Sequence, residues 1–205
     1  MLTLAAIIQA VAFTELIQSP QFEHLHFSLD RGDLLRVAQV GMMLQVVVVV
    51  WFGQIVNFSG YQLWPRRLFG FLDSFFAFVI GAIEAKLVHL LDQPRLWCVW
   101  FGWFFFLLLL AWLDFYRKMK QRQSANPTPV FGTRFERFKW MNVASAGVAG
   151  LCFWALAYWF RFAAVESQLT LFVFANLVAL CFTWAIKREW EDLKLISVSA
   201  HHGTS

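Results

Sequence analysis

The chain has 205 residues, of which 60% are hydrophobic, 19% aromatic and only 15% charged. A soluble domain carries charge on about a quarter of its residues, so this composition indicates an integral membrane protein and argues against a soluble domain. The net charge of +4 is small, and the sequence lacks the basic stripe of a nucleic-acid-binding surface. We therefore expect the partner to be the lipid bilayer and not a nucleic acid.

Six apolar segments follow one another along the chain. All but the first approach the roughly 20 residues that a helix needs to cross about 30 Å of hydrocarbon. The first could be a half-span, and because it lacks a positive n-region and a convincing cleavage site, we expect it to be retained. We predict an all-α bundle of six transmembrane helices, the first short, joined by short loops, over residues 1–17, 36–57, 67–91, 96–116, 139–163 and 168–187.

The distribution of basic residues predicts the orientation of these spans. If the N-terminus is cytoplasmic, 12 of the 17 Lys and Arg residues lie in inner segments, as the positive-inside rule requires. We therefore expect both termini in the cytoplasm, a bacterial-type inner or a plasma membrane, a six-span domain over 1–187 and a cytoplasmic tail over 188–205. The inner basic residues are Arg66, Arg67, Arg117, Lys118, Lys120, Arg122, Arg134, Arg137, Lys139, Lys187, Arg188 and Lys194.

An amphipathic segment precedes the fifth span. In VFGTRFERFKW, residues 130–140, the aromatic residues Phe131, Phe135 and Phe138 recur at helical spacing with basic residues between them. This pattern is suited to a helix that lies along the inner leaflet. A helix that packs on the rest of the protein is an equal alternative.

Acidic residues within the third apolar segment are candidate pathway residues. Asp73 and Glu84 lie eleven residues apart, and eleven steps of about 100° bring both side chains to one face of a helix. Ionisable groups inside a span usually turn towards the bundle interior and often mark ion or proton pathways. In the alternative interpretation, a shift of the helix places Glu84 near the outer headgroups. Conduction requires both carboxyl groups to face a hydrated interior.

Asp114, near the end of the fourth segment, is a third pathway candidate. The antiparallel arrangement places it towards the same membrane side as Asp73, and two facing carboxyl groups would form a proton or cation site. An ion pair with Arg117 or Lys118, which follow at i+3 and i+4, is the simpler structural account.

Three amide side chains are expected at mid-depth, those of Gln9, Gln45 and Asn176. Amides in hydrocarbon seek one another, so these residues are expected to link helices. A polar constriction along an inner path is the alternative.

Residues after the fourth and sixth spans are candidates for binding a cytoplasmic protein. The loop after the fourth span is basic, and the tail carries apolar residues on one helical stripe. The partner-docking candidates are Arg117, Lys118, Lys120, Arg122, Trp190 and Leu193.

Enzyme motifs are missing from the sequence. It contains no Gly-rich phosphate loop, no H-E-x-x-H, no C-x-x-C and no nucleophile elbow. The cysteines, Cys98, Cys152 and Cys181, lie in apolar runs, and the His24–His26 pair lies in a polar loop. We expect no catalytic residues, no cofactor and no metal site.

Two functions remain. The first is a small pore or transporter for cations or protons, lined by the third span and formed by a homo-oligomer, because a chain of 205 residues encloses little space. The second is a non-catalytic membrane anchor or sensor subunit that binds a cytoplasmic partner through the basic loop and the tail.

Overall fold

The computed structural model describes residues 2–26, 28–62, 71–125 and 133–202, and most of them are helical. Within these ranges the chain forms seven helices and no strand, which confirms the all-α prediction. The helices are α1 (Leu2–Ile17), α2 (Pro20–Glu23), α3 (Arg31–Gln62), α4 (Phe71–His89), α5 (Pro94–Ala125), α6 (Thr133–Trp159) and α7 (Val165–His202).

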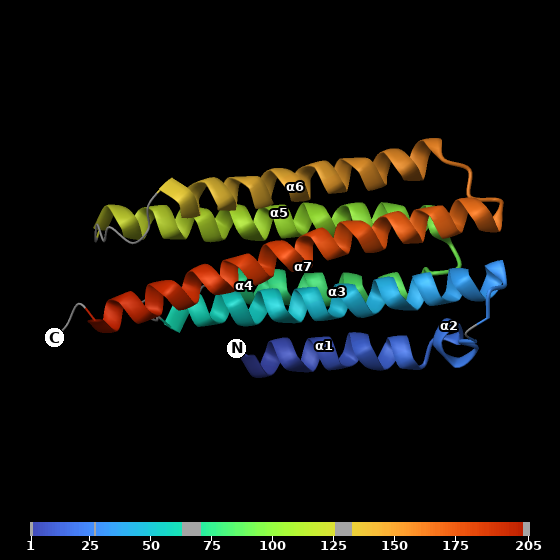
Figure 1. The fold of residues 1–205 in the computed structure, drawn as a ribbon, viewed down its shortest axis with the longest axis horizontal. Coiled ribbons are helices and arrows are strands. Elements are labelled where there is room, and N and C mark those ends of the chain that lie inside the picture. Colours follow the sequence, from blue (N-terminus) through green and yellow to red (C-terminus); the bar gives the residue numbers. More distant parts are fainter. Residues whose placement is uncertain (1, 27, 63–70, 126–132, 203–205) are drawn as a thin grey trace.

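The long helices lie side by side along one axis of the molecule, and short α2 lies at the turn between α1 and α3 (Figure 1). Successive long helices alternate in direction, so α1, α4 and α6 run one way and α3, α5 and α7 run the other. The most extensive contacts are between α5 and α6 and between α3 and α7, whereas α1 lies at the edge of the bundle against α3 and α4. Every predicted apolar segment overlaps one of these long helices.

Four helical stretches are long and apolar enough to cross a membrane. Ala6–Ile17 in α1 is apolar but shorter, and in α4 side chains are described only from Ser74 onwards. The helices therefore support a multi-pass membrane protein, while the crossing of the membrane by α1 and α4 stays a prediction. The four stretches are Arg31–Gly53, Pro94–Asp114, Trp140–Trp159 and Val165–Arg188.

The outer surfaces of these stretches are apolar as well. Val148 and Leu151 of α6 are 61% and 64% exposed, and Leu177 and Leu180 of α7 are more than half exposed. Soluble monomers rarely expose apolar patches of such extent, and a helix that is apolar on all sides is typical of a membrane span. Lipid is the environment that suits these faces.

Several helices extend beyond the predicted segments. α5 continues to Ala125 and α7 to His202, because the polar residues that follow the apolar stretches include strong helix formers such as Lys, Arg, Gln and Glu. α6 begins at Thr133, so residues 133–139 continue into the fifth predicted span and do not form a separate interfacial helix. α4 ends at His89, and Pro94 starts α5 at a position where its missing N–H is not needed.

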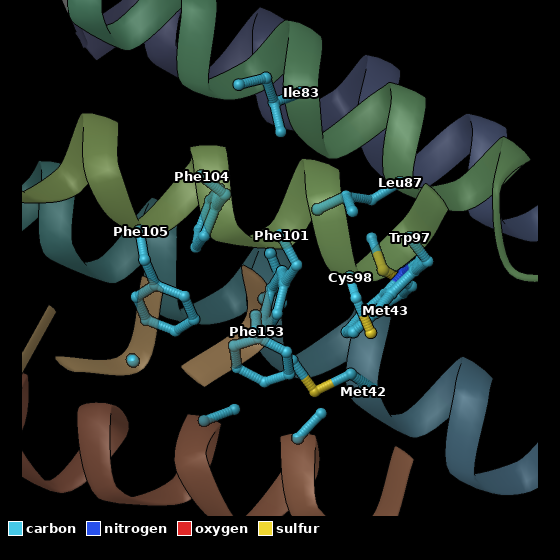
Figure 2. Packing of buried hydrophobic residues seen from close by; sticks show 14 of the residues in the cluster. Met42, Met43, Ile83, Leu87, Trp97, Cys98, Phe101, Phe104, Phe105 and Phe153 are labelled. Carbon is cyan, nitrogen blue, oxygen red and sulfur yellow. The ribbon is translucent and has the colours of Figure 1, made fainter. Parts of the chain in front are cut away.

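Aromatic side chains fill the core between α5, α6 and α7 (Figure 2). The rings of Trp97 and Phe101 stack at 4.4 Å between centroids, and Phe153 of α6 meets Phe101 edge to face at 4.6 Å. Phe172 of α7 contacts Trp97 at 4.9 Å. All four side chains are at most 1% exposed, so this part of the bundle is packed solid.

Small residues bring α5 and α6 close together. A Cβ atom on Gly150 would lie 3.3 Å from the carbonyl oxygen of Gly102, and one on Gly102 would lie 2.4 Å from the Trp154 ring. A Cβ atom on Gly147 would lie 3.0 Å from Leu109 Cδ1 of α5. The small residues of α6 therefore serve packing within the chain.

Candidate functional site

Glu84 is fully buried, with 0% of its surface exposed. It lies on a face of α4 that also buries Ile80 and Gly81, whereas Phe75 and Phe78 are 46% and 61% exposed on other faces. The predicted acidic stripe thus faces the inside of the bundle at Glu84. Ile83 and Leu87, its neighbours on α4, belong to the apolar core cluster (Figure 2).

The partner of Glu84 is Gln9 of α1. Gln9 Nε2 donates a hydrogen bond of 2.7 Å to Glu84 Oε2, and Gln9 is itself only 5% exposed. The other two oxygens of the pair, Gln9 Oε1 and Glu84 Oε1, are buried and meet no hydrogen-bond donor in the part of the chain that the structure describes. Buried polar atoms are nearly always paired, so this pair has capacity for a further ligand.

The close approach of α1 to α4 depends on Gly81. A Cβ atom at this position would lie 1.8 Å from Ile8 Cγ2, which no packed structure tolerates without movement. α1 turns Gln9, Ala12 and Leu16 towards the bundle, all at most 5% exposed, because residues three and seven apart share a helix face. Glu84 is therefore covered by α1.

A second polar contact joins the same helices nearer to their C-terminal ends. His89 Nε2 of α4 lies 3.1 Å from Glu15 Oε2 of α1, and both side chains are partly exposed. The order of the two contacts along α1 and α4 is the same, as expected for helices that run in parallel. The α1–α4 interface thus has a sealed inner pair and an accessible outer pair.

Long apolar segments of the three helices that contact α4 carry no cationic side chain. α1 carries no charged residue or histidine from 2 to 14, α3 none from 37 to 62, and α5 none from 96 to 113. Lys86 follows on α4 but is exposed on another face, because residues two apart on a helix do not face each other. The described neighbour that binds Glu84 is the neutral Gln9 amide.

The predicted mid-depth layer divides into two separate pairs. Gln45 Nε2 of α3 donates to Asn176 Oδ1 of α7 at 2.9 Å, and Asn176 Nδ2 donates to the carbonyl oxygens of Ala38 and Phe172. The bonds to Gln45 and Ala38 join α7 to α3, whereas the bond to Phe172 lies within α7. Gln9 belongs instead to the interface between α1 and α4.

The two other acidic candidates are not brought into this site by the described contacts. The side chain of Asp73 lies outside the described residues, although its backbone is in the first turn of α4. Asp114 is half-buried at the end of the apolar part of α5. Whether the two carboxyl groups face each other stays a prediction.

The partner-docking candidates lie on helical extensions. Arg117 is exposed on α5, and the extensions of α5 and α7 lie at the same end of the bundle, near the start of α6 (Figure 1). The side chains of the remaining candidates are outside the described residues; these are Lys118, Lys120, Arg122, Trp190 and Leu193.

Sequence reasoning did not find the partner of Glu84 or the role of Gly81. The apolar pattern of α1 does not show how α1 is aligned along α4. Gly81 also looks like any other helix glycine until the position of α1 is known. A polar residue inside an apolar segment is the signal that the sequence does offer, and it identified Gln9 and Glu84 separately.

No family model matches the chain, and no curated protein or solved structure is significantly similar to it. The geometry of the site is therefore what indicates a function for this chain.

Proposed function

We propose that the protein is a multi-pass membrane transporter of protons or other cations, in which all six long helices cross the bilayer and Glu84 carries the transported ion. A fully buried carboxyl group whose described partner is a neutral amide supports this function. Ionisable residues at membrane depth are costly, and they mark ion and proton pathways when they are kept.

The geometry favours a transporter over an open pore. Glu84 has no exposed surface, α1 covers it, and aromatic rings fill the core on the other side of α4. An ion can reach Glu84 only if a helix moves. α1 is the helix best suited to move, because it is short, lies at the edge of the bundle and contacts chiefly α3 and α4 (Figure 1).

A homo-oligomer is part of this proposal. One chain of 205 residues encloses little space, so association would provide hydrated access routes between copies. The mass of the detergent-solubilised protein, measured by light scattering, tests this; a mass of one chain contradicts it.

The test is ion flux into proteoliposomes that contain the purified protein. We expect flux with wild type, background flux with Glu84→Gln, which keeps the shape and removes the charge, and full flux with Glu191→Gln. Glu191 is an exposed acidic residue on the extension of α7, so this variant is a matched control. Equal flux with wild type and Glu84→Gln, or none with wild type, contradicts the proposal.

A second function, binding of a cytoplasmic protein, is favoured by the helical extensions. α5 and α7 continue beyond their apolar stretches at the same end of the bundle. There, the exposed Arg188 guanidinium lies 5.0 Å from the Trp184 ring centroid. A surface of this kind suits an acidic partner segment.

Truncation after Arg188 tests this second function. Co-purification from the native membrane should lose a partner when residues 189–205 are removed, while ion flux of the truncated protein should stay unchanged. Identical recovery of partners with both forms contradicts binding through the tail.

A further inference from the structure

We infer that the ion bound between Gln9 and Glu84 is a proton and not a metal cation, an inference that rests on the proposed transport function.

The Gln9–Glu84 pair has too few hydrogen-bond donors for its buried oxygens. Gln9 Nε2 already donates to Glu84 Oε2, and two buried oxygens, Gln9 Oε1 and Glu84 Oε1, meet no donor among the described residues. An ionised carboxylate only accepts hydrogen bonds, whereas a protonated carboxyl group also carries one O–H donor. One proton on Glu84 therefore provides the donor that the pair lacks.

The distribution of charges around the pair also favours a bound proton. A single negative charge in an apolar interior is strongly unfavourable without a compensating cation, and α1, α3 and α5 carry no basic residue beside Glu84. Among the other titratable side chains described on α4 and α5, His89 pairs with Glu15, Lys86 is exposed on another face of α4, and Cys98 of α5 is a buried thiol. A bound proton removes the charge without any further ligand.

A metal cation needs more ligands than the pair supplies. Hard cations such as Ca²⁺ and Mg²⁺ take about six or more oxygen ligands, and K⁺ sites replace a whole hydration shell with carbonyl oxygens. Here two side chains offer two spare oxygens, and the backbone carbonyls around them belong to regular helices. Among the described residues, no three His, Cys, Asp or Glu side chains are grouped as they would be to hold a metal ion.

The transport step is a reversible protonation of one oxygen. Hydronium from one side of the membrane transfers a proton to the Glu84 carboxylate, which forms an O–H bond and becomes neutral while water is released. α1 then closes over Glu84, so that Gln9 bonds the neutral carboxyl group. When Glu84 becomes accessible to the other side, the O–H bond breaks, water takes the proton, and the carboxylate is restored.

Two flux measurements in proteoliposomes test the inference. In the first, a pH-sensitive dye inside the vesicles reports acidification in Na⁺-free buffer under a K⁺ diffusion potential. In the second, uptake of tracer Na⁺ is measured in separate vesicles. We expect the lumen to acidify at equal rates with wild type and with Glu191→Gln. With Glu84→Gln, the rate of acidification should be at least tenfold lower. Gln9→Leu should slow acidification several-fold because the carboxyl group loses its bonded partner.

The outcomes separate this inference from the function on which it rests. Na⁺ uptake that depends on Glu84, without acidification, contradicts the inference that the ion is a proton but agrees with the proposed transport function. No flux of either ion with folded wild type overturns both.

Infrared difference spectroscopy provides a second readout that does not depend on flux. The carbonyl stretching band of a protonated carboxyl group in an apolar environment should be present in wild type at neutral pH and missing in Glu84→Gln. Its presence at equal strength in both proteins assigns the band to another residue and counts against the inference.

Discussion

Two helix interfaces of this bundle are built alike but differ in one chemical respect. The α3–α7 interface has an inner polar pair, Gln45 and Asn176, and an exposed ion pair, Arg31 and Glu166. The α1–α4 interface likewise has an inner pair and an outer pair, Gln9 with Glu84 and Glu15 with His89. Among the side chains that the structure describes, an ionisable group is buried at the second interface and not at the first.

This difference distinguishes an interface that can only join two helices from one that contains a group able to bind and release a proton. In the α3–α7 pair the Asn176 amide hydrogens are used on backbone carbonyls, and its oxygen accepts from Gln45. Gln45 Oε1 also lacks a described donor, but an amide does not gain or lose a proton near neutral pH, so the pair can only join helices. Glu84 can change charge, and its interface is the one formed by a short helix at the edge of the bundle.

The largest expected effect compares the inner pairs directly. Glu84→Gln should reduce proton flux at least tenfold, because the carried group is gone, whereas Asn176→Leu should retain at least half of the wild-type flux. Flux is measured per folded protein, with folding checked by gel filtration in detergent. Equal loss in both variants would remove the functional distinction between the two interfaces.

The sequence predicted the helices far better than their pairing. Runs of about twenty apolar residues follow from the thickness of the bilayer, so the segments that became α3, α5, α6 and α7 were visible without a structure. The polar residues were visible for the same reason, since each is exceptional within its apolar segment. Which of them meet depends on helix register, and lipid-facing and protein-facing apolar residues look alike in a sequence.

The next effect concerns the close approach of α1 to α4. Gly81→Ala adds a Cβ atom that would lie 1.8 Å from Ile8 Cγ2, so α1 must shift. We expect a loss of about 1–3 kcal/mol, as for other overpacked interfaces, measured by thermal or denaturant unfolding in detergent. Flux should fall as well, because the Gln9–Glu84 contact depends on the same approach.

Two further variants show whether the clash is the cause. In Gly53→Ala of α3 the new Cβ atom would meet Ile186 Cδ1 at 3.4 Å, an ordinary contact, so stability should hardly change. Ile8→Ala in the Gly81→Ala background should restore part of the lost stability. If the double variant is no more stable than Gly81→Ala, the steric explanation is wrong.

A smaller effect is expected from the α3–α7 inner pair. A double-mutant cycle with Gln45→Leu and Asn176→Leu should give a coupling free energy of about 0.6 kcal/mol, the average for hydrogen bonds between membrane helices. Unfolding in mixed micelles measures it. A coupling near zero would mean that the bond contributes nothing to holding α3 against α7, and the comparison would then rest on Glu84 alone.

The two exposed pairs could not be predicted from the sequence either, and the reason is again physical. Glu15 and His89 are 74 positions apart, and Arg31 and Glu166 are 135 apart. Each residue lies at a helix end where charged residues are common in any membrane protein, so nothing in the pattern distinguishes a paired residue from a solvated one. Only the parallel course of α1 and α4 brings the first pair together.

The smallest expected effect concerns these outer pairs. Exposed ion pairs contribute about 0–1 kcal/mol, so double-mutant cycles with Glu15→Gln and His89→Gln, and with Arg31→Gln and Glu166→Gln, should both give values of a few tenths. Unfolding in detergent measures both cycles. A Glu15–His89 coupling well above about 1 kcal/mol would show that this outer pair holds α1 against α4 more strongly than an exposed ion pair does.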